Sequence, residues 1–291
     1  MQLAYASRKN VKIKLALQGP SGSGKTMSAL LLAYGLCNDW TKIAVIDTEN
    51  RSSELFAHLG TFQVLPLETP FTPERYILAI ELCEKAGAEV IVVDSTSHEW
   101  FGTGGILHIH SGMKGNSYMN WNSLTPRHDA FMQAIIQSSA HIISTIRTKP
   151  NYLISERNGK VVPERIGMKA VTREGTEYEY TIVFELNMQN EAIAKKDRTN
   201  LFRDKPGFVI TSDTGHNILK WCNEDSDVVM NEAVTRINAC KSLGELLALY
   251  ETFSSQKDKL TPDFTKKKLE LNTTKQNSSL QTFSTNGSSK L

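Results

Sequence analysis

Eight consecutive residues near the N-terminus have the composition and spacing of a phosphate-binding loop. The pattern is G-x-x-x-x-G-K-T, and its glycines let the backbone wrap a phosphate chain with N–H groups pointing inward. The lysine would reach the β- and γ-phosphates of ATP, and the hydroxyl that follows it would bind Mg²⁺. A Gly-rich surface turn is the alternative, but the flanking strand and helix patterns favour the phosphate loop. The loop residues are Gly19, Pro20, Ser21, Gly22, Ser23, Gly24, Lys25 and Thr26.

Two carboxylates follow apolar runs farther along the chain. Asp94 follows Val90–Val93, and a carboxylate at the end of such a strand can hold Mg²⁺ beside a phosphate loop. Glu49 lies just beyond the run Lys42–Ile46, where it could orient or deprotonate an attacking water as a catalytic base. The alternative is that Asp47 or Glu49 only caps the next helix.

Two further ionisable residues, His98 and Glu99, lie just beyond Asp94. They could line the nucleotide site, with Glu99 as an alternative base, or they could only fix the loop after the strand. His108 and His110 are two residues apart, which on a helix directs them to different faces, so we do not expect a metal site there.

The elements that must position these groups alternate between strands and helices. Such alternation predicts an α/β domain with a mainly parallel central sheet covered on both faces. The second half changes to antiparallel hairpins, one around Arg157-Asn158-Gly159 and another over 179–195. The first-half strands are expected near 11–18, 42–46, 62–65, 90–95 and 141–146, with helices near 27–37, 52–59, 74–86 and 126–138.

The composition shifts along the chain predict four parts. Residues 1–10 form an N-terminal extension, 11–222 an ATPase domain and 223–271 a small helical appendage. Residues 272–291 are rich in Asn, Ser, Thr and Gln and are predicted to be a disordered tail.

Several longer segments resemble RecA-type recombinases, and most closely the phage-encoded RecA-like ATPases that include single-strand annealing and recombination proteins. Ile46–Asn50 resembles the segment with the catalytic glutamate, and Val92–Ser95 resembles the second Mg²⁺ motif. Ile143–Lys149 resembles the strand end that senses the γ-phosphate and leads into a DNA-contacting loop, which implies a sensing role for Thr145. Classical RecA has glutamine at that position. The other similar segments are 94–100, 121–128, 173–180 and 196–199.

The resemblance implies a RecA-like fold, ATP with Mg²⁺ as cofactor, and a homo-oligomeric ring or filament. It also implies that a neighbouring subunit supplies a basic residue to the γ-phosphate. The candidates for that role are Lys169, Lys195, Lys196 and Arg198, with an ordinary surface cluster as the alternative.

A basic stretch over 147–173 surrounds the first predicted hairpin. Basic side chains there could follow a phosphate backbone and Tyr152 could stack on a base, although a solvated charged hairpin is the alternative. The candidate residues for single-stranded DNA are Arg147, Lys149, Tyr152, Arg157 and Lys160.

Composition sets wide bounds. The chain has 291 residues, 40% of them hydrophobic and 22% charged, and a net charge of +2, so any DNA-binding surface must be local. No apolar run has the length of a membrane span, and the N-terminus lacks a signal-peptide pattern, so we expect a cytoplasmic protein. The resemblance implies a bacterial host cell and a phage or prophage origin. The four widely spaced cysteines are expected to be free thiols.

The residues thus favour an ATPase that acts on single-stranded DNA in phage recombination or replication, with a single-strand-binding protein as a further partner. One competing hypothesis is a small-molecule or nucleoside kinase, with 102–122 as its lid. Another is an ATP-binding helicase loader or scaffold. Glu49 and the Thr145–Lys149 segment favour water as the phosphoryl acceptor.

Overall fold

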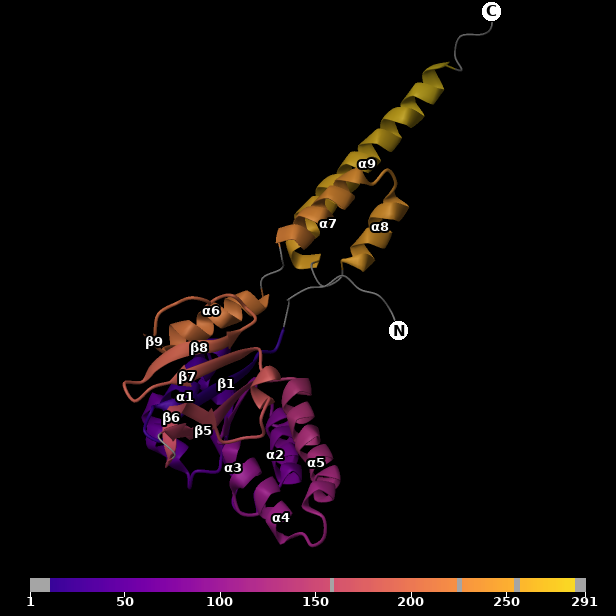
Figure 1. The fold of residues 1–291 in the computed structure, drawn as a ribbon. Helices are drawn as coiled ribbons and strands as arrows, with labels where there is room; N and C mark the ends of the chain where they lie inside the picture. Colours follow the sequence, from indigo (N-terminus) through magenta and orange to yellow (C-terminus); the bar gives the residue numbers. More distant parts are fainter. Residues whose placement is uncertain (1–10, 158–159, 224–226, 254–256, 286–291) are drawn as a thin grey trace, which may run out of the picture. The chain divides into compact units, whose positions relative to one another are not determined.

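The computed structural model describes residues 11–157, 160–223, 227–253 and 257–285. For 152–157, 160–166, 227–229 and 274–285 it describes the backbone alone. The chain divides into two compact units (Figure 1), a larger one over Lys12–Trp221 and a second one that contains Cys222–Leu291. The predicted extension 1–10 lies outside the described residues.

A mainly parallel sheet forms the centre of the larger unit. Its strand order is β3-β2-β4-β5-β1-β7-β8-β9, with β6 paired to the outer part of β5. All neighbours from β3 to β7 are parallel, whereas β8, β9 and β6 are antiparallel to their partners. The α/β fold class predicted from the sequence is therefore confirmed. The strands are β1 (Lys14–Gly19), β2 (Ile43–Asp47), β3 (Gln63–Pro66), β4 (Val90–Asp94), β5 (His141–Arg157), β6 (Lys160–Ala170), β7 (Ile182–Leu186), β8 (Glu191–Asp197) and β9 (Phe208–Val209).

Helices cover both faces of this sheet, which explains why its inner strands are apolar throughout. On one face, Tyr76 and Phe131 from two helices pack with Ile91 and Val93 of β4. On the other face, α1 contacts β1, β2, β4 and β5. The helices of this unit are α1 (Lys25–Cys37), α2 (Pro73–Lys85), α3 (Ser97–Phe101), α4 (Ile106–Gly112), α5 (Ser117–Gln137) and α6 (Ser212–Asn223), with 3₁₀ turns η1 (Trp40–Lys42), η2 (Ser52–Leu59) and η3 (Thr176–Tyr178).

Helix α5 begins nine residues before the position predicted from Pro126. Pro126 lies inside the helix, and Asn116 caps its start by accepting bonds from the backbone N–H groups of Tyr118 and Met119. The segment 102–122, considered above as a kinase lid, therefore contains α4 and the first turns of α5.

The described part of the second unit contains three helices, α7 (Asp227–Ala239), α8 (Leu243–Thr252) and α9 (Lys257–Thr285). Ile237, Leu246, Phe253, Leu260 and Phe264 form its separate hydrophobic core. The structure continues α9 to Thr285, where the composition had predicted a disordered tail from 272. The physical reason is that 263–285 contains no Gly or Pro to end the helix begun by the core-forming residues.

None of the described helices combines the length and the apolar character that crossing a bilayer requires.

Candidate nucleotide site

The phosphate loop joins β1 to α1 at the carboxyl edge of the parallel sheet. Gly22 and Gly24 have φ of 84° and 77°, a left-handed conformation that side chains disfavour. A Cβ on Gly24 would also lie 2.8 Å from Asn190 Oδ1. Ser23 Oγ donates to the carbonyl of Pro20 at 2.9 Å, which closes the turn. The glycines are thus required by conformation and, at Gly24, by space.

Lys25 folds back over this loop. Its Nζ donates to the carbonyl oxygens of Gly19 and Pro20 at 2.9 and 2.7 Å. Burial lowers the pKa of Lys25 from its usual value, and the charges of Asp94 and Glu49 oppose that shift. The ammonium group therefore lies within the electrostatic reach of both candidate carboxylates.

Asp94 lies at the end of β4 and accepts two hydroxyl hydrogen bonds. Thr26 Oγ1 donates to Asp94 Oδ2 at 2.6 Å, and Thr145 Oγ1 donates to Asp94 Oδ1 at 2.5 Å. Burial raises the pKa of Asp94, and the two hydroxyl bonds partly offset this increase. The carboxylate is only 3% exposed, so its position is defined by its partners.

The contact with Asp94 changes the role expected for Thr145. Its side chain is fully buried and donates to Asp94, so it orients that carboxylate instead of facing the loop as a γ-phosphate sensor. The sheet order explains the difference, because β5 lies between β1 and β4 and Thr145 is paired with Leu17 of β1.

The oxygen groups of Thr26 and Asp94 fit a Mg²⁺ ion. A hydroxyl and a carboxylate are hard oxygen ligands, and Mg²⁺ typically takes one or two carboxylates together with substrate phosphates and waters. Both groups lie beside the loop and converge on one another at hydrogen-bond distance. A bound Mg²⁺ would supply charge neutralisation for the phosphates.

The structure separates the roles of Asp47 and Glu49. Asp47 caps the following turn, because its carboxylate accepts bonds from the backbone N–H groups of Glu49 and Ser53 at 2.7 and 2.9 Å. Glu49 makes no such cap and lies beside Asp94. Its Oε1 accepts from Ser95 Oγ at 3.0 Å and from Arg147 Nε at 2.9 Å, and Arg147 pairs with its second oxygen as well.

The side chain of Glu49 remains 20% exposed, whereas the alternative base, Glu99, is 1% exposed. Both oxygens of Glu99 contact His128 Nδ1 at 3.0 to 3.1 Å, and burial raises its pKa. Glu99 therefore stabilises the packing of α3 against α5. His98 contacts Thr48 Oγ1 at 2.8 Å and stacks on Phe71, and burial lowers its pKa.

The four residues considered for a neighbouring subunit's site make local contacts. Lys195 pairs with Glu185 at 2.8 Å, and Lys169 with Glu174 at 3.4 Å. Lys196 donates to the carbonyls of Glu177 and Tyr178, and Arg198 donates to the latter at 3.4 Å. Burial, followed by the charge of Arg198, lowers the pKa of Lys196.

The predicted hairpin is present, formed by β5 and β6. Arg147 lies at its base and pairs with Glu49, whereas Lys149 is exposed. The side chains of Tyr152, Arg157 and Lys160 lie outside the described residues.

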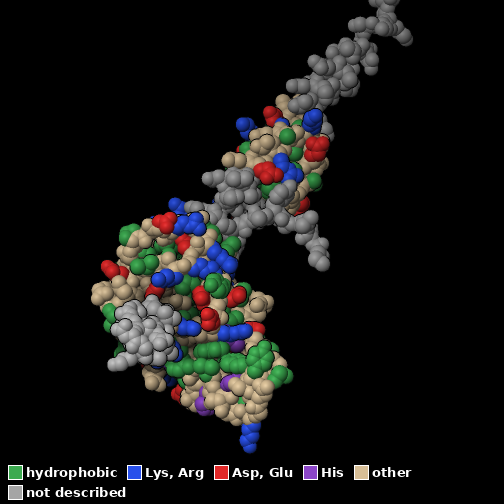
Figure 2. Space-filling view, viewed as in Figure 1, with side chains coloured by type: hydrophobic (Ala, Val, Ile, Leu, Met, Phe, Trp, Pro, Cys, Tyr) green, Lys and Arg blue, Asp and Glu red, His purple; other side chains and the backbone are tan. Residues whose placement is uncertain are grey.

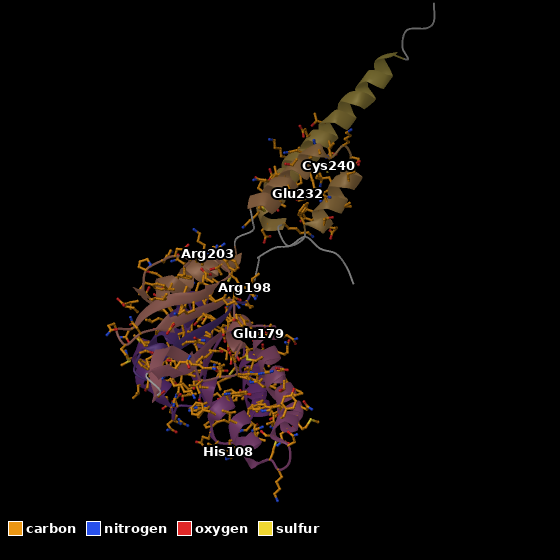
Figure 3. All side chains as sticks on the ribbon, viewed as in Figure 1. His108, Glu179, Arg198, Arg203, Glu232 and Cys240 are labelled. Atoms are coloured by element: carbon orange, nitrogen blue, oxygen red, sulfur yellow. The ribbon has the colours of Figure 1, made fainter. Side chains whose placement is uncertain are left out.

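His108 and His110 make hydrogen bonds on and beside α4. His108 Nδ1 accepts from Gly104 N at 3.0 Å, and His110 Nε2 contacts the carbonyl of Ser117 at 3.1 Å. Figure 3 shows His108 at the end of the larger unit opposite to Arg203. The described residues contain no cluster of three or more His, Cys, Asp or Glu side chains suited to a metal.

Sequence reasoning missed two members of the site. Ser95 contacts Glu49, and Arg147, assigned to DNA, contacts it from β5. The position of Ser95 directly after Asp94 was a usable signal, whereas the Arg147 contact depends on the sheet order.

Comparisons with known proteins identify a family for the larger unit. A family model described as an AAA domain matches residues 11–218. A search of curated proteins finds no match. Among solved structures, a KaiC-like protein from the hyperthermophilic archaeon Pyrococcus horikoshii OT3 is similar, with 14% identity and a TM-score of 0.37. The match covers 68% of this chain and 82% of the archaeal one.

Proposed function

Since the chain belongs to the AAA domain family and is a P-loop ATPase, we propose that it is a Mg²⁺-dependent ATPase coupled to single-stranded DNA. The observation that supports this most strongly is the convergence of Lys25, Thr26, Asp94 and Glu49 at one edge of the sheet. A kinase binds an acceptor substrate beside the γ-phosphate. The partly exposed carboxylate of Glu49 favours water as the acceptor instead, because it can take a proton from a water molecule that reaches it.

Each residue has a role in this mechanism. Lys25 would neutralise the β- and γ-phosphates of bound ATP, and Thr26 and Asp94 would hold Mg²⁺. Glu49 takes the proton from the attacking water. Thr145 positions Asp94, and Arg147 controls the availability of Glu49, because its two-point contact occupies both carboxylate oxygens that would otherwise face the attacking water.

The coupling to DNA follows from the continuity of β5. The strand passes through Thr145 and Arg147 and continues into the hairpin with β6, where the register shifts between Asn151 and Tyr152. A phosphate backbone bound at that hairpin would compete with Glu49 for Arg147. DNA binding would thereby release Glu49 for catalysis, in an assembly that is a ring or a short filament acting in phage recombination or replication.

One experiment tests the proposal and separates it from the alternatives. Phosphate release should be measured with Mg²⁺-ATP alone, with single-stranded DNA and with a panel of nucleosides, using Lys25→Ala as the inactive control. We expect stimulation by DNA only. Phosphorylated nucleoside would support a kinase, and DNA-independent turnover would support a loader or scaffold.

A second experiment tests the coupling. Arg147→Ala should raise turnover without DNA towards the stimulated rate and so reduce the stimulation ratio, whereas Arg147→Lys should retain part of the effect. If Arg147→Ala has the same DNA stimulation ratio as the original protein, at unchanged ATP affinity, Arg147 has no role in the coupling.

A further inference from the structure

A groove lined by aromatic and basic side chains lies beside the β5–β6 hairpin, outside the nucleotide site. It has a volume of about 890 Å³ and runs between α3, α5 and the segment that follows β6. Figure 2 shows a band of hydrophobic side chains over α3 and α5, with Lys and Arg side chains beside it. Its principal lining residues are Trp100, Phe101, Tyr118, Trp121, Lys149 and Arg173.

The aromatic wall is ordered by ring contacts. Trp100 and Trp121 stack with centroids 5.8 Å apart and an angle of 22°, and Trp121 stacks on His110 at 4.4 Å. Trp100 also contacts His128 edge to face at 5.3 Å, which connects it to the buried Glu99. This wall is therefore preorganised.

Other aromatic groups in the groove are open to solvent. Tyr118 is 81% exposed and Phe101 is 40% exposed. Exposing rings of this size has a free-energy cost in water, so a contiguous group of them indicates a binding surface.

The opposite wall is basic. Lys149, Lys169 and Arg173 line the groove together with one carboxylate, that of Glu174. The ion pairs of Lys169 with Glu174 and of Arg173 with Asp129 are between exposed side chains. Such pairs contribute little to stability, so a phosphate can replace the carboxylate partner at small cost.

We propose that this groove binds single-stranded DNA, with bases stacked on Tyr118, Trp100 and Trp121 and phosphates paired with Lys149, Lys169 and Arg173. An apolar peptide would leave the cations without partners, whereas a single strand supplies both flat aromatic rings and regularly spaced negative charge. The inference rests on the proposed function, because it assigns a site to the DNA that stimulates the ATPase.

The test compares a fluorescein-labelled oligothymidine with an abasic deoxyribose-phosphate chain of equal length. In the full-length protein, Tyr118→Ala and Trp121→Ala should each weaken oligothymidine binding roughly 5- to 100-fold and leave abasic binding unchanged. Lys149→Ala should weaken both and reduce the salt slope by about one unit. Leu55→Ala and Lys85→Ala, at exposed positions outside the groove, serve as controls.

A second measurement does not depend on the fold of the alanine variants. The chain has four tryptophans, so replacing Trp40 and Trp221 by Phe leaves Trp100 and Trp121 as the only sources of tryptophan emission. Oligothymidine should quench this emission and the abasic chain should not.

The outcomes distinguish the two proposals. One outcome is that DNA stimulates turnover, but Tyr118→Ala binds oligothymidine with unchanged affinity and the tryptophan emission is not quenched. This outcome would contradict the DNA site in the groove and leave the proposed function intact. Equal binding of the abasic and base-containing chains would overturn base stacking. Absence of any DNA binding or stimulation in the original protein would overturn both.

Discussion

Among the individual side chains, Glu49 has the environment that most clearly distinguishes a catalytic group from a structural one. Asp47, two residues earlier, accepts the backbone hydrogen bonds of the turn, which leaves the Glu49 carboxylate to face Ser95 and Arg147. Glu99 is buried against His128 and has no comparable access to water. We therefore propose Glu49, and not Glu99, as the base.

Glu49→Gln should retain ATP binding and lose hydrolysis by roughly 10²-fold or more, because the amide keeps the shape but cannot accept the proton. The measurement is single-turnover phosphate release beside equilibrium binding of a fluorescent ATP analogue. Glu99→Gln is the matched control, with near-normal turnover expected. If hydrolysis is instead lost in Glu99→Gln and retained in Glu49→Gln, the base is Glu99.

Thr145→Val should remove one hydroxyl donor from the buried Asp94 carboxylate. Leaving such an acceptor short of a partner costs about 1–3 kcal/mol, and the Mg²⁺ concentration needed for half-maximal turnover should rise. Thr145→Ser keeps the hydroxyl and should behave like the original protein. Identical Mg²⁺ dependence in all three proteins would show that Asp94 does not need this contact.

Among the elements, the pairing of β1 with β5 connects the phosphate loop to the hairpin formed by β5 and β6. The two strands are parallel from Lys14 to Gly19, and the backbone N–H of Ile13 donates to Nδ1 of the buried His141 at 3.1 Å. Burial lowers the pKa of His141 to about 3, and the charges of Lys12 and Lys14 act in the same direction. The imidazole is therefore neutral in the folded protein.

This histidine should make stability depend on pH. Below the ordinary value of 6.5 the unfolded chain binds a proton that the folded protein excludes. Stability is then lost as pH falls, by about 1.4 kcal/mol per unit until the folded pKa near 3 is approached. His141→Asn, whose carbonyl can accept the Ile13 bond, should lack this component.

Urea unfolding at several pH values between about 7 and about 4 measures the difference. The stability of His141→Asn relative to the original protein should increase steadily as pH falls. Parallel stability curves for the two proteins would mean that His141 is protonated in the folded state.

For the whole molecule, the open question is whether one chain contains a complete catalytic site. Within its own subunit Lys196 contacts the carbonyls of Glu177 and Tyr178, and the described part of the chain offers no contact between Lys196 and the phosphate loop. A role for Lys196 at a γ-phosphate would therefore need a second copy of the chain.

Mixing Lys25→Ala subunits with Lys196→Ala subunits should restore part of the turnover that each lacks alone, because each supplies the half that the other has lost. Specific activity of the original protein should rise with its concentration. Lys85→Ala replaces Lys196→Ala in the control mixture. Full activity in a monomer, independent of concentration, would exclude the subunit-crossing mechanism.

Site features formed by residues close together in the sequence could be predicted. Contacts between residues that the sheet brings together from distant segments could not. The phosphate loop, Asp94 and the α/β class follow from local patterns, because a turn with left-handed glycines and a buried strand each depend on neighbouring residues. Thr145 and Arg147 reach Asp94 and Glu49 only because β5 inserts between β1 and β4. The groove likewise joins Trp100, Trp121 and Arg173 across more than seventy residues. Strand order and helix packing depend on long-range burial, which no local pattern encodes, and they therefore required the folded structure.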